Sequence, residues 1–357
     1  MTATVGSPPG RVVVRLPNWI GDIVMATPLL RALRQAWPRA HVAVAGPKHA
    51  AAILDGLDSV DEVLDLPSRR ASGLGGMRRA AARLAEGRFD LGLLLTNSFS
   101  SALVMALARV PLRVGYAEGG RGPLLTHKVS RRSEAGRHRM PVPMVEAYAR
   151  LLDAVGVPRA GHRYELVATP DDEQAADAWM QRQGLPPDAP LWGFHPGASF
   201  GPSKLWYPER FAAVADALVE RRGGRALVFC GPAEADLARA VAAAGRSDIL
   251  TAADDPISLG TLKAVVKRLS LLVTIDTGPR HFGAAFDVPT VVLMGATEPR
   301  FTNTNLHSSA IVRTGVSCSP CQRKVCPLTG GDFHRCMTTM SPEQVLAACE
   351  RVLEGAA

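Results

Sequence analysis

The sequence has no apolar run of the roughly 18–20 residues that a membrane-spanning helix needs. Its first ten residues, MTATVGSPPG, lack the basic start and the apolar stretch of a secretory signal peptide. Low-complexity tracts and short repeats are absent as well. We therefore expect a cytoplasmic protein whose contact with any membrane is peripheral and whose cysteines are mostly reduced.

Aromatic residues are scarce, at 5 % of the 357 residues, whereas the net charge is +8. The basic excess is concentrated between Arg69 and Arg139, where fourteen arginines and lysines face four acidic residues. Such a bias suits nucleic acid, an anionic membrane or an anionic glycolipid, or simply forms a solvated surface. Because no aromatic stacking motif is interleaved with the arginines, base stacking is disfavoured, and we expect no nucleic-acid partner.

Cysteine is also rare, but four of the six cysteines lie in one short segment: Cys318, Cys321, Cys326 and Cys336. Thiolates at this spacing can close a tetrahedral site around zinc or iron. A redox-sensitive disulfide and plain buried thiols are the alternatives. In a reducing cytoplasm we favour a structural metal, with zinc slightly ahead of iron, because four protein ligands leave no open coordination position.

The chain does contain two halves of the same type, in which apolar strands alternate with helical segments. This alternation predicts parallel sheets built from βαβ units. The expected strands are 11–15, 41–45, 63–66, 91–95, 191–195, 225–230, 269–275 and 289–294; the expected helices are 23–37, 74–87, 101–108, a segment within 141–157, 171–183, 208–221, 233–244 and 341–353. We predict one Rossmann-like domain at 1–165 and a second one at 166–340, which contains the cysteine segment. The terminal helix, within 341–357, is expected to pack back toward the first domain.

The most informative segment is the turn after strand 269–275, which begins Asp276-Thr277-Gly278. Open parallel sheets bind ligands beyond the carboxyl ends of their strands. The backbone N–H groups of Thr277 and Gly278 near a helix start suit a phosphate. An ordinary strand-to-helix turn capped by Asp276 is the alternative.

Two more turns of the second half carry polar residues at strand ends. His195 closes one strand and is followed by Ser199 and Lys204, which offer donors and a positive charge to a diphosphate. Glu234 follows another strand and suits the hydroxyls of a ribose. In the first half, Gly21 and Asp22 stand at the corresponding place, where a carboxylate can be a general base or a helix cap.

These turns together resemble the ADP-heptose:lipopolysaccharide heptosyltransferases of glycosyltransferase family 9, nearest to the heptosyltransferase II type. The resemblance extends over nearly the whole chain, through RVVVRLPNWIGDIVMATPLLRALR, FHPGASFGPSKLWYPERFAAVA, IDTGPRHFGAAFDVPTVVLMGATEP and CSPCQRKVCP. It implies the α/β GT-B architecture, in which two Rossmann-like doubly wound domains face a central cleft. It also implies that the domain at 1–165 binds the acceptor and that the domain at 166–340 binds the nucleotide sugar. Related autotransporter heptosyltransferases carry a cysteine-bound iron at a different spacing.

The resemblance also implies roles for individual residues. Asp22 matches the family's base for the acceptor hydroxyl, and Ser199 and Lys204 match its diphosphate contacts. Glu234 matches the ribose contact. The nucleotide and heptose site corresponds to Asp276, Thr277, Gly278 and His281. Arg280 stands where relatives often have Met or Leu, and the resemblance gives it no role.

We therefore expect an inverting transfer of heptose from ADP-heptose to a heptose of the lipopolysaccharide inner core, at the inner face of the inner membrane, without a catalytic cofactor. One alternative is a heptosyltransferase I type enzyme acting on Kdo2-lipid A. The other is a non-catalytic nucleic-acid-binding protein with a cysteine knuckle.

Overall fold

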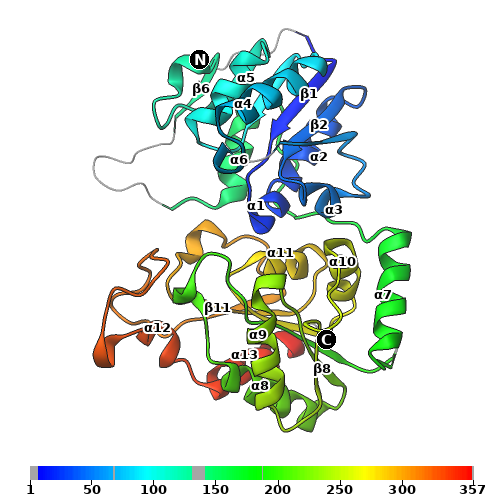
Figure 1. The fold of residues 1–357 in the computed structure, drawn as a ribbon, viewed down its shortest axis with the longest axis vertical. Coiled ribbons are helices and arrows are strands. Elements are labelled where there is room, and N and C mark those ends of the chain that lie inside the picture. The colour runs from blue at the N-terminus through cyan, green and yellow to red at the C-terminus, as the bar shows by residue number, and fades with distance from the viewer. Residues whose placement is uncertain (1–6, 67–68, 131–140, 187, 356–357) are drawn as a thin grey trace. The chain divides into compact units, whose positions relative to one another are not determined.

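A computed structural model describes residues 7–66, 69–130, 141–186 and 188–355 of the protein. The chain divides into two compact units, Met1–Glu165 and Leu166–Ala357, each built on its own sheet (Figure 1). Among the described residues no helix has the combined length and apolarity to cross a bilayer.

The first unit contains a parallel sheet in the order β3-β2-β1-β4-β5-β6. Its strands are β1 Arg11–Arg15, β2 His41–Gly46, β3 Glu62–Asp65, β4 Leu91–Leu94, β5 Leu112–Tyr116 and β6 His127–Val129. The helices are α1 Ile20–Val24, α2 Thr27–Ala36, α3 Ala50–Leu54, α4 Arg69–Glu86, α5 Phe99–Leu107 and α6 Met144–Asp153. The strand order reverses between β1 and β4, so the turns after these two strands flank the switch point where such sheets bind ligands.

The single helix expected at 23–37 is two helices, α1 and α2. Pro28 lies in the first turn of α2 and has no N–H to donate to the carbonyl of Val24, four residues earlier. The Thr27 hydroxyl donates to that carbonyl instead, at 2.8 Å. The break keeps α1 short and confines it to the turn after β1.

The second unit repeats the arrangement in the order β12-β11-β10-β7-β8-β9. Its strands are β7 Leu191–His195, β8 Arg225–Val228, β9 Ile249–Thr251, β10 Leu271–Ile275, β11 Thr290–Leu293 and β12 Ser309–Val312. The helices are α7 Pro170–Arg182, α8 Pro208–Arg222, α9 Ala235–Ala244, α10 Leu259–Lys267, α11 Gly278–Ala285, α12 Arg335–Thr338 and α13 Pro342–Glu354. Here the order reverses between β10 and β7, both of which are fully buried.

The terminal helix α13 begins as its sequence predicts. Ser341 accepts the N–H of Gln344, and the Gln344 side chain accepts the N–H of Ser341, which satisfies two backbone donors at the helix start. Its buried residues, among them Val345 and Cys349, join the core formed by β7, β8, β10 and β11. The apolar face of α13 is thus part of the second unit's core.

Candidate active site

Three of the predicted turns lie side by side in the second unit, because the strands that carry them are neighbours. β10 pairs with β7 at Thr274 and His195, and β7 pairs with β8 at Phe194 and Val228. The turns after Ile275, His195 and Val228 therefore open at the same edge of the sheet, at its switch point. This edge is where a doubly wound sheet binds its ligand.

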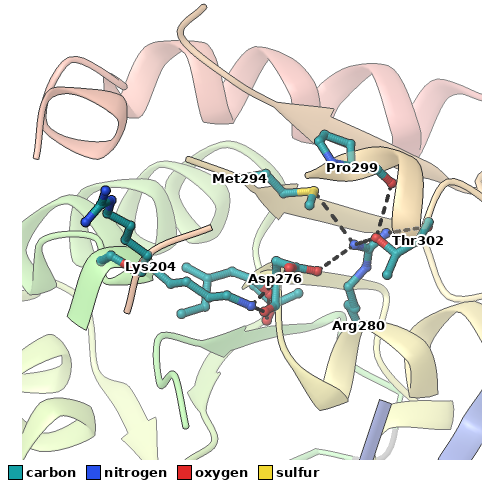
Figure 2. Close-up of polar contacts among 10 residues, drawn as sticks. Lys204, Asp276, Arg280, Met294, Pro299 and Thr302 are labelled. Carbon is teal, nitrogen blue, oxygen red and sulfur yellow. Dashed lines mark hydrogen bonds and ion pairs between the residues drawn. The ribbon is translucent and has the colours of Figure 1, made fainter. Parts of the chain in front are cut away.

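Lys204 and Asp276 connect two of these turns (Figure 2). Lys204, at the end of the short helix η2 (Pro202–Lys204), places its Nζ 3.0 Å from Oδ2 of Asp276 and 2.5 Å from the Asp276 carbonyl oxygen. The same Nζ lies 4.9 Å from the centre of the Phe200 ring. An ion pair thus joins the turns after β7 and β10.

Arg280 binds the other oxygen of the same carboxylate. Its Nη1 donates to Asp276 Oδ1 at 2.9 Å and to the Thr302 hydroxyl at 2.9 Å, and its Nη2 donates to the Thr302 carbonyl at 3.3 Å (Figure 2). Burial would raise the pKa of the Asp276 carboxyl, but the charges of Arg280 and Lys204 outweigh it and hold that pKa well below its usual range. Asp276 is therefore a fixed anion between two cations.

His281, Thr277 and Gly278 surround the start of α11. Thr277 is the N-cap residue, in extended conformation, and Gly278 is the first helical residue, so their backbone N–H groups stand at the positive end of the helix. His281 is buried, and this burial, together with the charge of Arg280, lowers its pKa to about 3. The imidazole is therefore neutral near pH 7.

Glu234 lies against His195 at the end of β7. Its Oε2 is 3.8 Å from His195 Nε2 and accepts the N–H of Gly231 at 3.1 Å. A Cβ at Gly197 would lie 2.1 Å from the Glu234 carboxyl carbon, so only glycine lets the two turns approach this closely. His195 Nδ1 is buried and has no hydrogen-bond partner among the described residues. Ser199, by contrast, is exposed in the turn that leads to Lys204.

Asp22 and Gly21 belong to the first unit, in α1, directly after β1. Gly21 is buried and Asp22 is half-buried in the first turn of the helix. Trp19, the N-cap residue of α1, is 53 % exposed, although no other tryptophan of the chain is more than 9 % exposed. The carboxylate thus stands beside an open aromatic side chain at the switch point of the first sheet.

The cysteine segment, residues 318–336, surrounds a cavity of about 220 Å³. Its four thiols, Cys318, Cys321, Cys326 and Cys336, all line this cavity, together with His334. Burial and the negative charge of the other three cysteines raise the pKa of Cys336 to about 11. All six cysteines are free thiols. Within the described ranges, no three His, Cys, Asp or Glu side chains are arranged to hold a metal ion.

The cysteine segment also holds the turn that carries Lys204, which sequence reasoning missed. Ser203 donates its N–H to the Lys324 carbonyl at 3.1 Å and its hydroxyl to the Arg323 carbonyl at 2.5 Å. The His334 ring is 3.0 Å from the Ser203 carbonyl oxygen. Because these contacts join residues more than 100 positions apart, no local sequence pattern predicts them.

Comparison with known proteins bears on this site. The model of glycosyltransferase family 9 (heptosyltransferase) matches residues 77–330. Lipopolysaccharide heptosyltransferase 2 of Salmonella typhimurium is 27 % identical over 351 residues, which cover 96 % of this chain and 98 % of the relative.

Two solved structures are similar over their whole length. The Escherichia coli ADP-heptose LPS heptosyltransferase II structure is 25 % identical, with a TM-score of 0.78 over 97 % of this chain and 99 % of that one. A family 9 glycosyltransferase from Veillonella parvula has a TM-score of 0.82 at 23 % identity, covering 99 % of both chains. These structures confirm the predicted GT-B architecture. The chain belongs to glycosyltransferase family 9, the heptosyltransferase family, and is a transferase.

Proposed function

We propose that this transferase moves L-glycero-D-manno-heptose from ADP-heptose to a heptose of the lipopolysaccharide inner core. The names of the full-length relatives support the donor and the acceptor class. The observation that carries the proposal is the cationic site of Lys204, Asp276 and Arg280 at the switch point, since a leaving diphosphate needs positive charge.

The donor lies on the second unit in this proposal. The Lys204 ammonium and the turn at Ser199 contact the diphosphate. The Glu234 carboxylate accepts hydrogen bonds from the ribose hydroxyls. The N–H groups at Thr277 and Gly278 suit a phosphate or a heptose hydroxyl. Neutral His281 can donate or accept a hydrogen bond without adding charge.

Asp22 is the proposed general base. It takes the proton of the acceptor hydroxyl while that oxygen forms a bond to the anomeric carbon of the heptose. The bond from this carbon to the β-phosphate oxygen breaks in the same step, and ADP leaves with the bonding electron pair. A single displacement from the opposite face inverts the anomeric configuration. No catalytic cofactor takes part.

A transfer assay on three acceptors tests the function. ADP-heptose is offered to lipid A-core carrying zero, one or two heptoses, and the products are weighed by mass spectrometry. We expect one heptose to be added to the acceptor that already has one. Addition only to the heptose-free acceptor would assign the enzyme to the heptosyltransferase I type. Thermal stabilisation by an oligonucleotide but not by ADP would favour the nucleic-acid alternative.

A structural zinc or iron in the cysteine segment is a separate proposal. Four thiols around one cavity are the donor set that these metals prefer, and closing a shell would need the thiols to move inward. Elemental analysis of protein purified under reducing conditions without chelator tests it: about one equivalent is expected for one four-thiolate site. Four titratable thiols in this segment and no bound metal would contradict the metal proposal and favour plain thiols.

A further inference from the structure

Arg280 is a buried cation whose Nη1 and Nη2 groups both donate to protein atoms. Only 5 % of the side chain is exposed. It contacts Asp276, the hydroxyl and carbonyl of Thr302, and the sulfur of Met294, which lies 3.8 Å from Nη1 (Figure 2). These partners surround the guanidinium and fix it to the far oxygen of Asp276. Arg280 therefore acts through Asp276 and through its charge rather than as a direct ligand.

The charges of the cluster formed by Lys204, Asp276 and Arg280 do not balance, and the Glu234 carboxylate of the neighbouring turn lies against His195 instead. Lys204 and Asp276 alone would form a neutral ion pair, and Arg280 adds one positive charge to it. The neighbouring His281 is neutral. A buried net charge without a counter-ion is unfavourable unless a ligand supplies the opposite charge. A nucleoside diphosphate supplies it.

Arg280 also changes how Lys204 can act. With one Asp276 oxygen occupied by the guanidinium, the Lys204 ammonium shares only the other oxygen and the backbone carbonyl. If Arg280 were an apolar residue, the carboxylate would neutralise Lys204 alone. The second cation thus leaves part of the Lys204 charge available to an incoming anion.

We infer that Arg280 is a positioning residue for donor binding: by compensating Asp276 it keeps the cluster of Lys204, Asp276 and Arg280 net positive, so that this cluster recognises the diphosphate of the donor. This inference rests on the proposed function, in which the donor diphosphate lies at Lys204.

ADP binding by calorimetry, at low and at physiological salt, tests the inference on the full-length protein. Arg280→Met should weaken ADP binding about tenfold, the effect of one charge in a poorly solvated site. It should also flatten the salt dependence, because screening acts on the charge that has been removed. Arg280→Lys should restore most of the affinity. In the transfer assay, the donor KM should rise with a smaller change in kcat.

Two further variants separate charge from structure. Thr302→Val removes a hydrogen bond from the guanidinium but keeps its charge, so affinity should stay within about threefold and the salt dependence should persist. Arg222→Met removes an exposed arginine that pairs with Glu350 at the opposite edge of the sheet, and should leave ADP binding unchanged. Thermal melting checks the folding of each variant.

The inference is overturned if Arg280→Met binds ADP as the wild type does, or if Thr302→Val reproduces its loss. It is also overturned if Arg280→Lys is as weak as Arg280→Met, since the shape of the guanidinium would then matter and not its charge. If the wild type itself fails to bind ADP, the proposed donor site fails, and this inference fails with it.

Discussion

The two aspartates of the proposed site have different surroundings. Asp276 is held between Lys204 and Arg280, which keep its pKa well below the usual range despite its burial. A carboxylate of such low basicity is a poor proton acceptor near pH 7. Asp22, half-buried in the first turn of α1, is outside that arrangement. The base is therefore to be sought at Asp22.

Replacing Asp22 tests this assignment. Asp22→Asn should abolish turnover, with a loss of at least about a hundredfold, while ADP affinity stays at the wild-type value. The reason is that the proposed nucleotide contacts belong to the other unit of the chain. Asp90→Asn is the matched control, since Asp90 accepts the Arg11 N–H at the opposite edge of the same sheet. Normal turnover in well-folded Asp22→Asn protein would contradict the base role.

His281 predicts a pH dependence of stability. Its pKa is about 3 when folded and about 6.5 when exposed, so between these values only the unfolded chain binds the proton. Stability should thus be complete above pH 6.5 and fall as the pH drops toward 3, by up to about 1.4 kcal/mol per pH unit. His281→Gln should show a shallower fall in Tm between pH 6.5 and 4, while exposed His307→Gln should follow the wild type. Parallel curves for wild type and His281→Gln would contradict this.

At the scale of single residues, strand-end turns could be read from the sequence and their connections could not. His195, Glu234 and Asp276 each follow an apolar run, which is a local signal. Arg280 is four residues after Asp276, a spacing that brings helical neighbours together, but its second partner, Thr302, comes from a distant segment. Such a contact cannot be predicted from the sequence, so the charge balance of the site became apparent only from the structure.

At the scale of elements, the position of the η2 turn depends on hydrogen bonds to a distant part of the chain, the cysteine segment. Lys204 sits on three residues held at Ser203 by the cysteine segment. A change in the conformation of that segment should therefore shift the Lys204 ammonium, because Ser203 precedes Lys204 directly. We therefore expect changes in the cysteine segment to affect donor binding as well as stability, because this segment contacts the turn that carries Lys204, a proposed ligand of the donor.

Gly201→Ala tests the coupling. A Cβ at Gly201 would lie 2.5 Å from the Lys324 carbonyl oxygen, so the η2 turn and the cysteine segment must separate. We expect a loss of about 1–3 kcal/mol in stability and a donor KM raised about tenfold. Gly330→Ala is the control: its φ is also positive, at 59°, but a Cβ there meets nothing within 4 Å. It should lower Tm and leave KM unchanged; equal KM values in both variants would refute the coupling.

The central strands were predicted except β5, whereas among the edge strands only β3 was predicted. Four central strands are buried on both faces, and their sequences are nearly continuous apolar runs: β1, β4, β7 and β10. The edge strands β6, β9 and β12 are three or four residues long and largely half-exposed, so they carry no such run. Their pairing depends on the neighbouring strand more than on their own composition.

For the whole molecule, the uneven charge predicts a salt-sensitive contact with anionic membranes. Four arginines of this basic region can be neutralised together. They lie outside the described residues and are Arg131, Arg132, Arg137 and Arg139. Changing all four to serine should cost about 1 kcal/mol of vesicle binding per residue at low salt. Cosedimentation with vesicles containing anionic lipid measures this. Binding that ignores both the substitutions and the ionic strength would contradict a peripheral electrostatic contact.

Trp19 gives the molecule an optical reporter. Because the other four tryptophans are buried, a water-soluble quencher should reach mainly the indole beside Asp22. A glycolipid that covers the turn after β1 should shield this indole from the quencher, whereas ADP alone should leave it accessible. Occupancy of the acceptor side could then be followed by fluorescence in unlabelled protein, separately from occupancy of the donor side.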